Sequence, residues 1–208
     1  MSFFWSRFLA FPSGKDSTAI PSLFFCRLPV LETRDLLLRK PERKDAKDIF
    51  LYASDEEVAR YVLWEPHRNM GDTRRFVSYL RTRIHSGYPS SWVVLLRNTG
   101  TVIGTIGFVT YSPEHGFAEL GYSFSREYWN RGYATQALQA VIDIVFRSLP
   151  LNRLEAQYDI RNPASGRVMQ KCGLRQEGLL RGRIKNKGEY VDTILCSILR
   201  SDWEKDQR

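Results

Sequence analysis

Apolar and polar residues follow regular patterns along the chain from Glu32 onward. Short, mainly apolar runs predict β-strands, and apolar residues that recur every third or fourth position predict helices with one buried face. The predicted strands cover residues 36–39, 92–96, 102–110, 117–124, 154–160, 179–184 and 190–199. The predicted helices cover residues 41–53, 55–61, 72–85, 134–149 and 164–172. This order of elements predicts a single α+β domain.

Residues 1–30 do not follow this pattern. They contain many aromatic residues and three prolines, namely Pro12, Pro21 and Pro29. Arg7 interrupts the early apolar run and no small-residue cleavage site follows, so the segment does not predict a signal peptide. We interpret residues 1–30 as a mobile N-terminal arm, with a docking or membrane-touching arm as the alternative, and residues 31–208 as the folded domain.

Composition and charge narrow the function only partly. The chain is 43% apolar and 26% charged, as in globular proteins, and no apolar run is long enough to insert stably across a membrane. The chain has three cysteines without C-x-x-C spacing and three scattered histidines, which predict neither a disulfide framework nor a metal site. Such cysteine usage is typical of a reducing compartment, so we expect a cytoplasmic location. The net charge of +8 favours acidic partners, among them nucleotides, nucleic acids and acidic proteins.

The segment Tyr128–Thr135 lies between a predicted strand and the start of a predicted helix. A tight turn at this point brings several free backbone N–H groups together at the positive end of the helix dipole, which is a site that binds phosphate. The alternative is that Gly132 forms a simple corner between strand and helix.

Three more segments accompany this turn. They are residues 161–165 (Arg-Asn-Pro-Ala-Ser) with 171–174 (Lys-Cys-Gly-Leu), residues 118–122 (Ala-Glu-Leu-Gly-Tyr), and the Gly-x-Tyr-x-Asp of residues 188–192. Together the four segments resemble the GNAT superfamily of acyl-CoA-dependent N-acetyltransferases, over Thr33 to Trp203. Within it the chain resembles the branch of ribosomal-protein N-terminal-alanine acetyltransferases. The resemblance implies a GNAT fold, with a mixed, mostly antiparallel twisted sheet flanked by helices.

Two positions depart from the pattern of relatives. In the motif Q/R-x-x-G-x-G/A, Gly132 and Ala134 match, while Trp129 occupies the first position. Cys196 stands where relatives often carry a tyrosine, which puts an aromatic contact to the thiol region in doubt.

The resemblance implies acetyl-CoA as cosubstrate and no metal. It places the pyrophosphate on backbone N–H groups and the pantetheine arm along the predicted strand as an added strand. The pyrophosphate-binding residues would be Arg131, Gly132, Tyr133, Ala134 and Thr135, and the strand would contribute Leu120, Gly121, Tyr122 and Phe124. Asn162 would hydrogen-bond the pantetheine amides; it is also well placed to cap the helix ahead of Pro163, and both roles are compatible.

The resemblance also implies the catalytic groups. Glu119 is the candidate general base, acting through water, and its alternative role is an exposed or ion-paired carboxylate. Ser165 is the candidate proton donor to the CoA thiolate, and its alternative role is an ordinary residue of the first helical turn. Backbone N–H near Tyr122 would stabilise the oxyanion.

The acceptor side is less well defined. Trp64, Glu65 and His67 occupy a loop where the family builds its acceptor groove, although a plain surface loop is the alternative. The alternating basic run of Arg181, Arg183, Lys185 and Lys187 would face ribosomal RNA, an acidic protein or the CoA 3′-phosphate, or simply solvent.

Three functions therefore remain from the sequence. The first is acetylation, by direct attack in a ternary complex, of the N-terminal α-amino group of a protein, possibly ribosomal and with ribosome association. The second is acetylation of a small amine such as a polyamine or an aminoglycoside. The third is a non-catalytic acyl-CoA-binding or RNA-associated module. The sequence leaves open whether the protein is a monomer or a homodimer.

Overall fold

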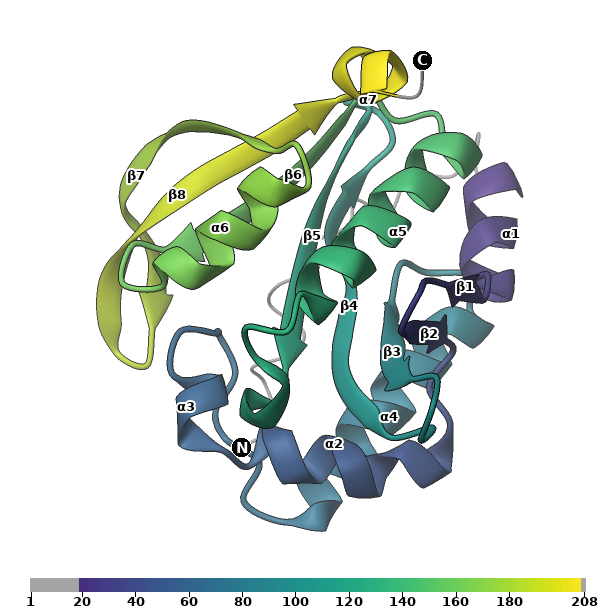
Figure 1. Cartoon of the computed structure of the whole chain (residues 1–208), viewed down its shortest axis with the longest axis vertical. Helices are drawn as coiled ribbons and strands as arrows, with labels where there is room; N and C mark the ends of the chain where they lie inside the picture. Colours follow the sequence, from purple (N-terminus) through teal and green to yellow (C-terminus); the bar gives the residue numbers. More distant parts are fainter. Residues whose placement is uncertain (1–18, 207–208) are drawn as a thin grey trace.

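The computed structural model describes residues 19–206, which fold around an eight-stranded sheet of order β1-β2-β3-β4-β5-β6-β8-β7 (Figure 1). The strands are β1 (Leu31–Glu32), β2 (Leu36–Arg39), β3 (Ser91–Leu96), β4 (Val102–Ser112), β5 (Phe117–Phe124), β6 (Arg153–Asp159), β7 (Arg175–Asn186) and β8 (Glu189–Leu199). Neighbouring strands are antiparallel except β5 and β6, which are parallel. The predicted α+β class, with a mixed and mostly antiparallel sheet flanked by helices, is confirmed.

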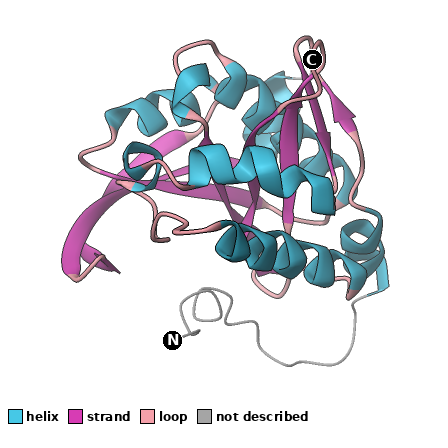
Figure 2. Cartoon of the chain, turned by 90° about the horizontal axis from the view of Figure 1, so that it is seen from below, coloured by secondary structure: helices cyan, strands magenta, loops and turns pink. Residues whose placement is uncertain are grey.

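Helices cover both sides of this sheet (Figure 2). They are α1 (Ala19–Arg27), α2 (Ala46–Ala53), α3 (Glu56–Ala59), α4 (Met70–His85), α5 (Tyr133–Ser148), α6 (Pro163–Lys171) and α7 (Arg200–Asp206), with the 3₁₀ turns η1 (Arg43–Asp45) and η2 (Arg126–Tyr128). In Figure 1, α5 and α6 lie in front of the sheet and α4 lies behind it.

Two apolar clusters hold these layers together. The larger one joins α5 and α6 to the sheet, and the smaller one joins α2 and α4 to its other side. The apolar stripe predicted for α5 packs into the larger cluster, where Ala137, Leu138, Val141 and Val145 are fully buried. Burying such side chains contributes about 25 cal/mol per Å² of apolar surface, so this stripe fixes α5 and its N-terminal turn against the sheet.

The domain extends further toward the N-terminus than the pattern predicts. Residues 19–30 belong to the predicted arm, yet α1 packs on the sheet, with Phe25 buried and its ring centroid 5.1 Å from the rings of Phe108 and Tyr111. Trp92 Nε1 donates a hydrogen bond of 2.7 Å to the carbonyl oxygen of Pro29. This part of the predicted arm is therefore core. Residues 1–18 lie outside the described residues.

The short elements β1 and α7 are also absent from the prediction. In α7, Trp203 Nε1 donates a 2.8 Å hydrogen bond to Asp143 on α5, so the C-terminal helix is fixed by a contact distant in sequence. No helix among residues 19–206 is long and apolar enough to cross a membrane.

Candidate active site

The sheet divides between β5 and β6. Their parallel pairing covers only residues 117–119 against 153–155, and past Glu119 the edge of β5 has no strand partner on this side. In Figure 1 the two strands lie together near α7 and diverge toward the N-terminal end of α5. The unpaired edge of β5 includes Leu120, Gly121, Tyr122 and Phe124, the residues predicted to pair with pantetheine. Such an edge offers backbone groups to an extended ligand.

A turn with free backbone N–H groups lies at the start of α5. Asn130 and Gly132 adopt left-handed backbone conformations, with φ of 59° and 79°. Within residues 19–206, the N–H groups of Arg131, Gly132, Tyr133, Ala134 and Thr135 have no hydrogen-bond acceptor. Converging N–H groups at a helix N-terminus bind anions, and a Cβ built on Gly132 meets nothing within 4 Å, so the approach is open.

Two contacts hold this turn in place. Trp129 Nε1 donates a 2.8 Å hydrogen bond to the carbonyl oxygen of Phe124, which ties the turn to the end of β5. Arg126 forms a 3.1 Å ion pair with Asp55, the N-cap of α3. Trp129, which departs from the common motif, therefore positions the predicted phosphate loop through its indole.

Glu119 lies at the last paired position before the strands divide. Its Oε1 accepts a 2.8 Å hydrogen bond from Gln157 Nε2, and Gln157 Oε1 in turn accepts one of 3.0 Å from Thr193. Burial raises the pKa of Glu119, the Gln157 hydrogen bond opposes that rise, and neighbouring Glu155 adds to it. A carboxylate made more basic in this way suits a general base.

Tyr122 and Ser165 form a pair that the sequence did not indicate. The Tyr122 hydroxyl lies 2.9 Å from Ser165 Oγ and 3.0 Å from the Ser165 carbonyl oxygen. A phenol carries one proton, so when Tyr122 donates to the carbonyl, Ser165 keeps its own proton free to donate. Burial raises the pKa of Tyr122 well above its ordinary range, so the phenol stays neutral. Tyr122 thus places an aromatic hydroxyl beside Ser165, at a point of the site where the sequence put an aromatic contact in doubt.

Asn162 caps α6. Its Oδ1 accepts a 3.3 Å hydrogen bond from the Ser165 N–H, and Pro163 follows at the first helical position, as the capping alternative predicts. The cap uses the amide oxygen. Within the described chain the amide nitrogen donates no hydrogen bond, so the cap leaves a donor for the predicted pantetheine contact.

The predicted acceptor residues have different environments. Glu65 is exposed and Trp64 is half-buried, packed against the α2–α4 cluster. His67 is buried. Its backbone N–H donates a 2.8 Å hydrogen bond to the Ala53 carbonyl oxygen, and its ring atom Nδ1 lies 2.8 Å from Thr73 Oγ1. The structure thus removes His67 from the surface that an acceptor reaches, because the loop folds back over α2 and takes the imidazole inside.

Lys187, at the tip of the β7–β8 hairpin, joins that hairpin to α3. Its ammonium group donates to the carbonyl oxygens of Ala59 and Val62, the latter at 3.1 Å, and lies 3.4 Å from that of Arg60. Arg181, Arg183 and Lys185 are exposed, so Lys187 is the residue of the predicted basic run that hydrogen-bonds to another part of the described chain.

Replacing Ser165 by alanine is expected to lower kcat at least about tenfold, because a positioned proton donor contributes about 10²–10⁴-fold. Tyr122→Phe, which removes only the phenolic oxygen, is expected to have the smaller effect. Both are measured as thiol release from acetyl-CoA at saturating acceptor. A larger loss in Tyr122→Phe than in Ser165→Ala would reverse the two roles.

Lys187→Met is expected to lower the free energy of unfolding by about 1–2 kcal/mol, because charge-assisted hydrogen bonds to carbonyls of α3 are lost. The measurement is urea denaturation. Lys185→Met is the matched control, since Lys185 is exposed and its ammonium lies over the Tyr190 ring at 5.7 Å. Equal stability of the two variants would show that the Lys187 contact adds nothing.

Within residues 19–206, no group of three or more His, Cys, Asp or Glu side chains is arranged to hold a metal ion.

Comparison with known proteins identifies relatives of this architecture. A family model described as "Acetyltransferase (GNAT) domain" matches residues 35–175. The "Uncharacterized N-acetyltransferase p20" of Bacillus licheniformis is 34% identical over 176 residues, which are 85% of this chain and 99% of that protein. A crystal structure of an acetyltransferase (GNAT family) from Bacillus anthracis superimposes with a TM-score of 0.74 at 33% identity, covering 83% of this chain and 99% of that one.

Proposed function

The chain belongs to the GNAT acetyltransferase family, and we propose that it transfers the acetyl group of acetyl-CoA to the N-terminal α-amino group of a protein, with ribosomal proteins as the leading acceptors. The observation that carries the proposal is Glu119, a buried carboxylate with a raised pKa at the point where β5 and β6 divide. At this point Glu119 lies beside the unpaired edge of β5, which would bind the pantetheine arm, and it contacts Gln157 of β6.

Acetyl-CoA as the donor is supported by the turn at the start of α5 and by structural neighbours. A microcin C7 self-immunity acetyltransferase whose structure contains acetyl-CoA and AMP has the same fold, with a TM-score of 0.73 at 18% identity. In this chain the N–H groups of residues 131–135 would hold the pyrophosphate, and Asn162 Nδ2 would donate to the pantetheine arm.

The reaction needs a neutral amine, and here an α-amino group is favoured. Its pKa is about 8, against about 10.4 for lysine, so a carboxylate of raised pKa removes its proton more easily. Glu119 would take this proton, directly or through a water. The neutral Tyr122 would hold Ser165 so that the serine hydroxyl protonates the departing thiolate.

Distant relatives support more than one acceptor. The "Putative ribosomal N-acetyltransferase YdaF" of Bacillus subtilis is 22% identical over 187 residues, covering 89% of this chain and all of that protein. The spermidine N(1)-acetyltransferase of Vibrio cholerae is 23% identical over 168 residues, covering 81% of this chain and 95% of that protein. If the acceptor is a ribosomal protein, we expect this enzyme to associate with the ribosome and to be located in the cytoplasm.

A small cationic amine is the second candidate, and one observation favours it. Glu155 pairs in register with Glu119, so their side chains share a face of the sheet, and Glu177 lies nearby. Arg153 contacts both Glu155 and Glu177, at 2.6 and 2.9 Å, and therefore compensates only part of their charge. The carboxylates at and beside the base would attract a polyamine, against the opposing positive charges of Arg183 near Glu119 and Arg175 near Glu177.

The test is release of free thiol from acetyl-CoA, run in parallel with an alanine-starting ribosomal-protein peptide, spermidine and an aminoglycoside. The control acceptor is the same peptide with its N-terminus already acetylated. Turnover on the free peptide alone supports the protein acceptor. Turnover on spermidine or the aminoglycoside but not on the peptide would transfer the proposal to small amines. Equal turnover on the blocked peptide would exclude the α-amino group.

A further inference from the structure

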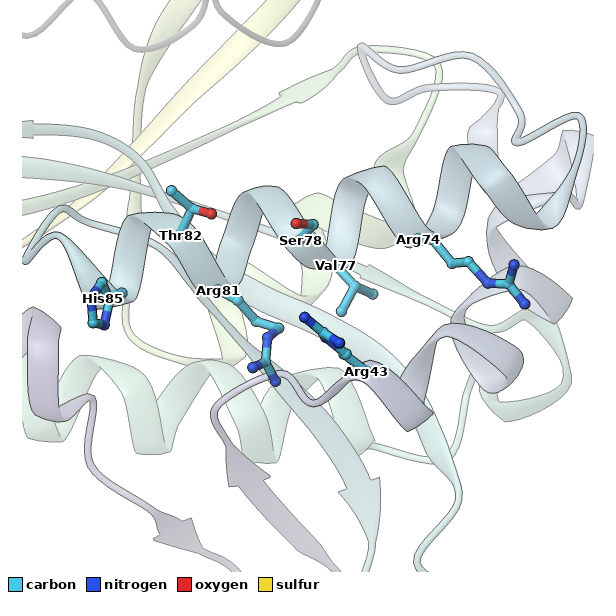
Figure 3. Close-up of a pocket in the computed structure, with 7 residues that line it drawn as sticks. All are labelled: Arg43, Arg74, Val77, Ser78, Arg81, Thr82 and His85. Atoms are coloured by element: carbon cyan, nitrogen blue, oxygen red, sulfur yellow. The ribbon is translucent and has the colours of Figure 1, made fainter.

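A groove of about 600 Å³ runs along the outer side of α4, away from the predicted acetyl-transfer site (Figure 3). Seven residues line it: Arg43, Arg74, Val77, Ser78, Arg81, Thr82 and His85. All except Arg43 come from α4, and Arg43 lies opposite on η1. Because α5 and its phosphate loop pack on the other side of the sheet, a ligand in this groove would not contact them.

The groove has a positive charge that the described part of the chain does not neutralise. Arg43, Arg74 and Arg81 are exposed and form no ion pair within residues 19–206. Neighbouring cations differ, since Arg75 pairs with Asp72 and Lys44 with Glu42. The free guanidinium groups of the groove therefore remain available to an anion.

The spacing of these side chains suits an extended polyanion. Arg74 and Arg81 are seven residues apart on one helix, which is about 10 Å along its axis. In Figure 3, Ser78 and Thr82 lie together along one edge of α4, whereas Arg81 and Arg43 lie along the other edge. Arg81 Nη1 is 3.4 Å from the Pro41 carbonyl oxygen, so this guanidinium is held toward η1 and Arg43.

We propose that this groove binds the sugar–phosphate backbone of double-stranded RNA. Arginine forms paired hydrogen bonds with phosphate oxygens, and serine and threonine hydroxyls also contact phosphate and sugar. In an RNA duplex the 2′-hydroxyls face the wide minor groove, where Ser78 and Thr82 can contact them. His85 contributes the only ring among the seven lining residues, and no Phe, Tyr or Trp lines the groove, so it lacks the large flat surfaces on which single-stranded bases stack; this favours backbone contacts independent of base sequence.

The experiment measures binding of a fluorescein-labelled RNA duplex to the full chain by anisotropy, over a range of salt concentrations. Each arginine that contacts a phosphate adds about one to the slope of log K against log salt. In the double variant Arg74→Ala/Arg81→Ala, the magnitude of this negative slope should decrease by about two. Binding at low salt should weaken at least about tenfold. Acetyl transfer should be unchanged in this variant, because the groove lies apart from the acetyl-transfer site.

The control variant, Arg181→Ala/Arg183→Ala, removes the same charge from the β7–β8 hairpin and should retain binding. Loss of RNA binding in the control, with retention in Arg74→Ala/Arg81→Ala, would overturn the proposal and assign binding to the hairpin. Equal affinity for a DNA duplex of the same sequence would overturn the contacts to 2′-hydroxyls. Tighter binding of a labelled polyglutamate peptide would identify an acidic protein as the ligand instead.

Discussion

Glu119→Gln is expected to lower kcat by about 10²–10⁴-fold while leaving the dissociation constant for acetyl-CoA unchanged. Glutamine keeps the shape of the side chain and can still hydrogen-bond Gln157, but it cannot accept a proton from the amine. The measurements are thiol release for turnover and calorimetry for acetyl-CoA binding. Undiminished turnover would remove Glu119 from the chemistry and leave it as a structural carboxylate.

The pH dependence gives an independent check on this residue. Burial raises the pKa of Glu119, so activity that requires the carboxylate should increase with pH across a range above that of an ordinary glutamate, and glutamine should abolish this dependence. A raised folded-state pKa means that the stability contributed by the protonated form is lost as pH rises through that pKa. Glu119→Gln should therefore unfold at the same Tm as the parent at neutral pH, or higher. A variant inactive because it is unfolded would show a lower Tm.

Gly132→Val is expected to weaken acetyl-CoA binding at least about 100-fold, which corresponds to about 2.7 kcal/mol. Gly132 has a φ of 79°, a conformation that a β-branched residue adopts only with strain, and its open side is where the pyrophosphate would approach. Calorimetric titration with acetyl-CoA measures the effect. An unchanged dissociation constant would contradict the assignment of the phosphate loop.

The matched control for strain is Gly100→Val. Gly100 has a φ of 71°, a Cβ built on it also meets nothing within 4 Å, and it lies in the turn between β3 and β4. Strain alone costs about 1–2 kcal/mol of stability in either variant. Gly100→Val should therefore lower stability without changing acetyl-CoA binding, and the difference between the two variants isolates the effect on the ligand.

Much of the fold could be predicted because its signals are local. The stripe on α5 repeats at helical spacing, and the turn at Gly132 combines a strand end, a glycine and a helix start. By contrast, α1 and α7 are short and are stabilised by side chains that contact partners far away in sequence, among them Phe25 and Trp203. A pattern read along the chain contains no information on such contacts.

The same reason explains what was missed at the site. The Glu119–Gln157 hydrogen bond depends on the parallel register of β5 and β6, which the chain reaches only after α5. Alternation along β5 places Tyr122 opposite to Glu119, but only the position of α6 brings Ser165 within 2.9 Å of its hydroxyl. His67 was expected at the surface because the loop is polar, whereas folding of that loop buries the ring.

The short seam between β5 and β6 also bears on the order in which the protein folds. Before α5, the antiparallel strands β3, β4 and β5 follow one another with short turns, and after it β7 and β8 form a hairpin, so these two parts of the sheet can assemble from local contacts. The parallel seam has to wait for α5 to cross over, and it contains only three residue pairs. Glu119 occupies the last of these pairs. The carboxylate predicted to act as the base thus belongs to the region expected to form late and to open early, so activity would report on the joining of these two parts more sensitively than helix content does.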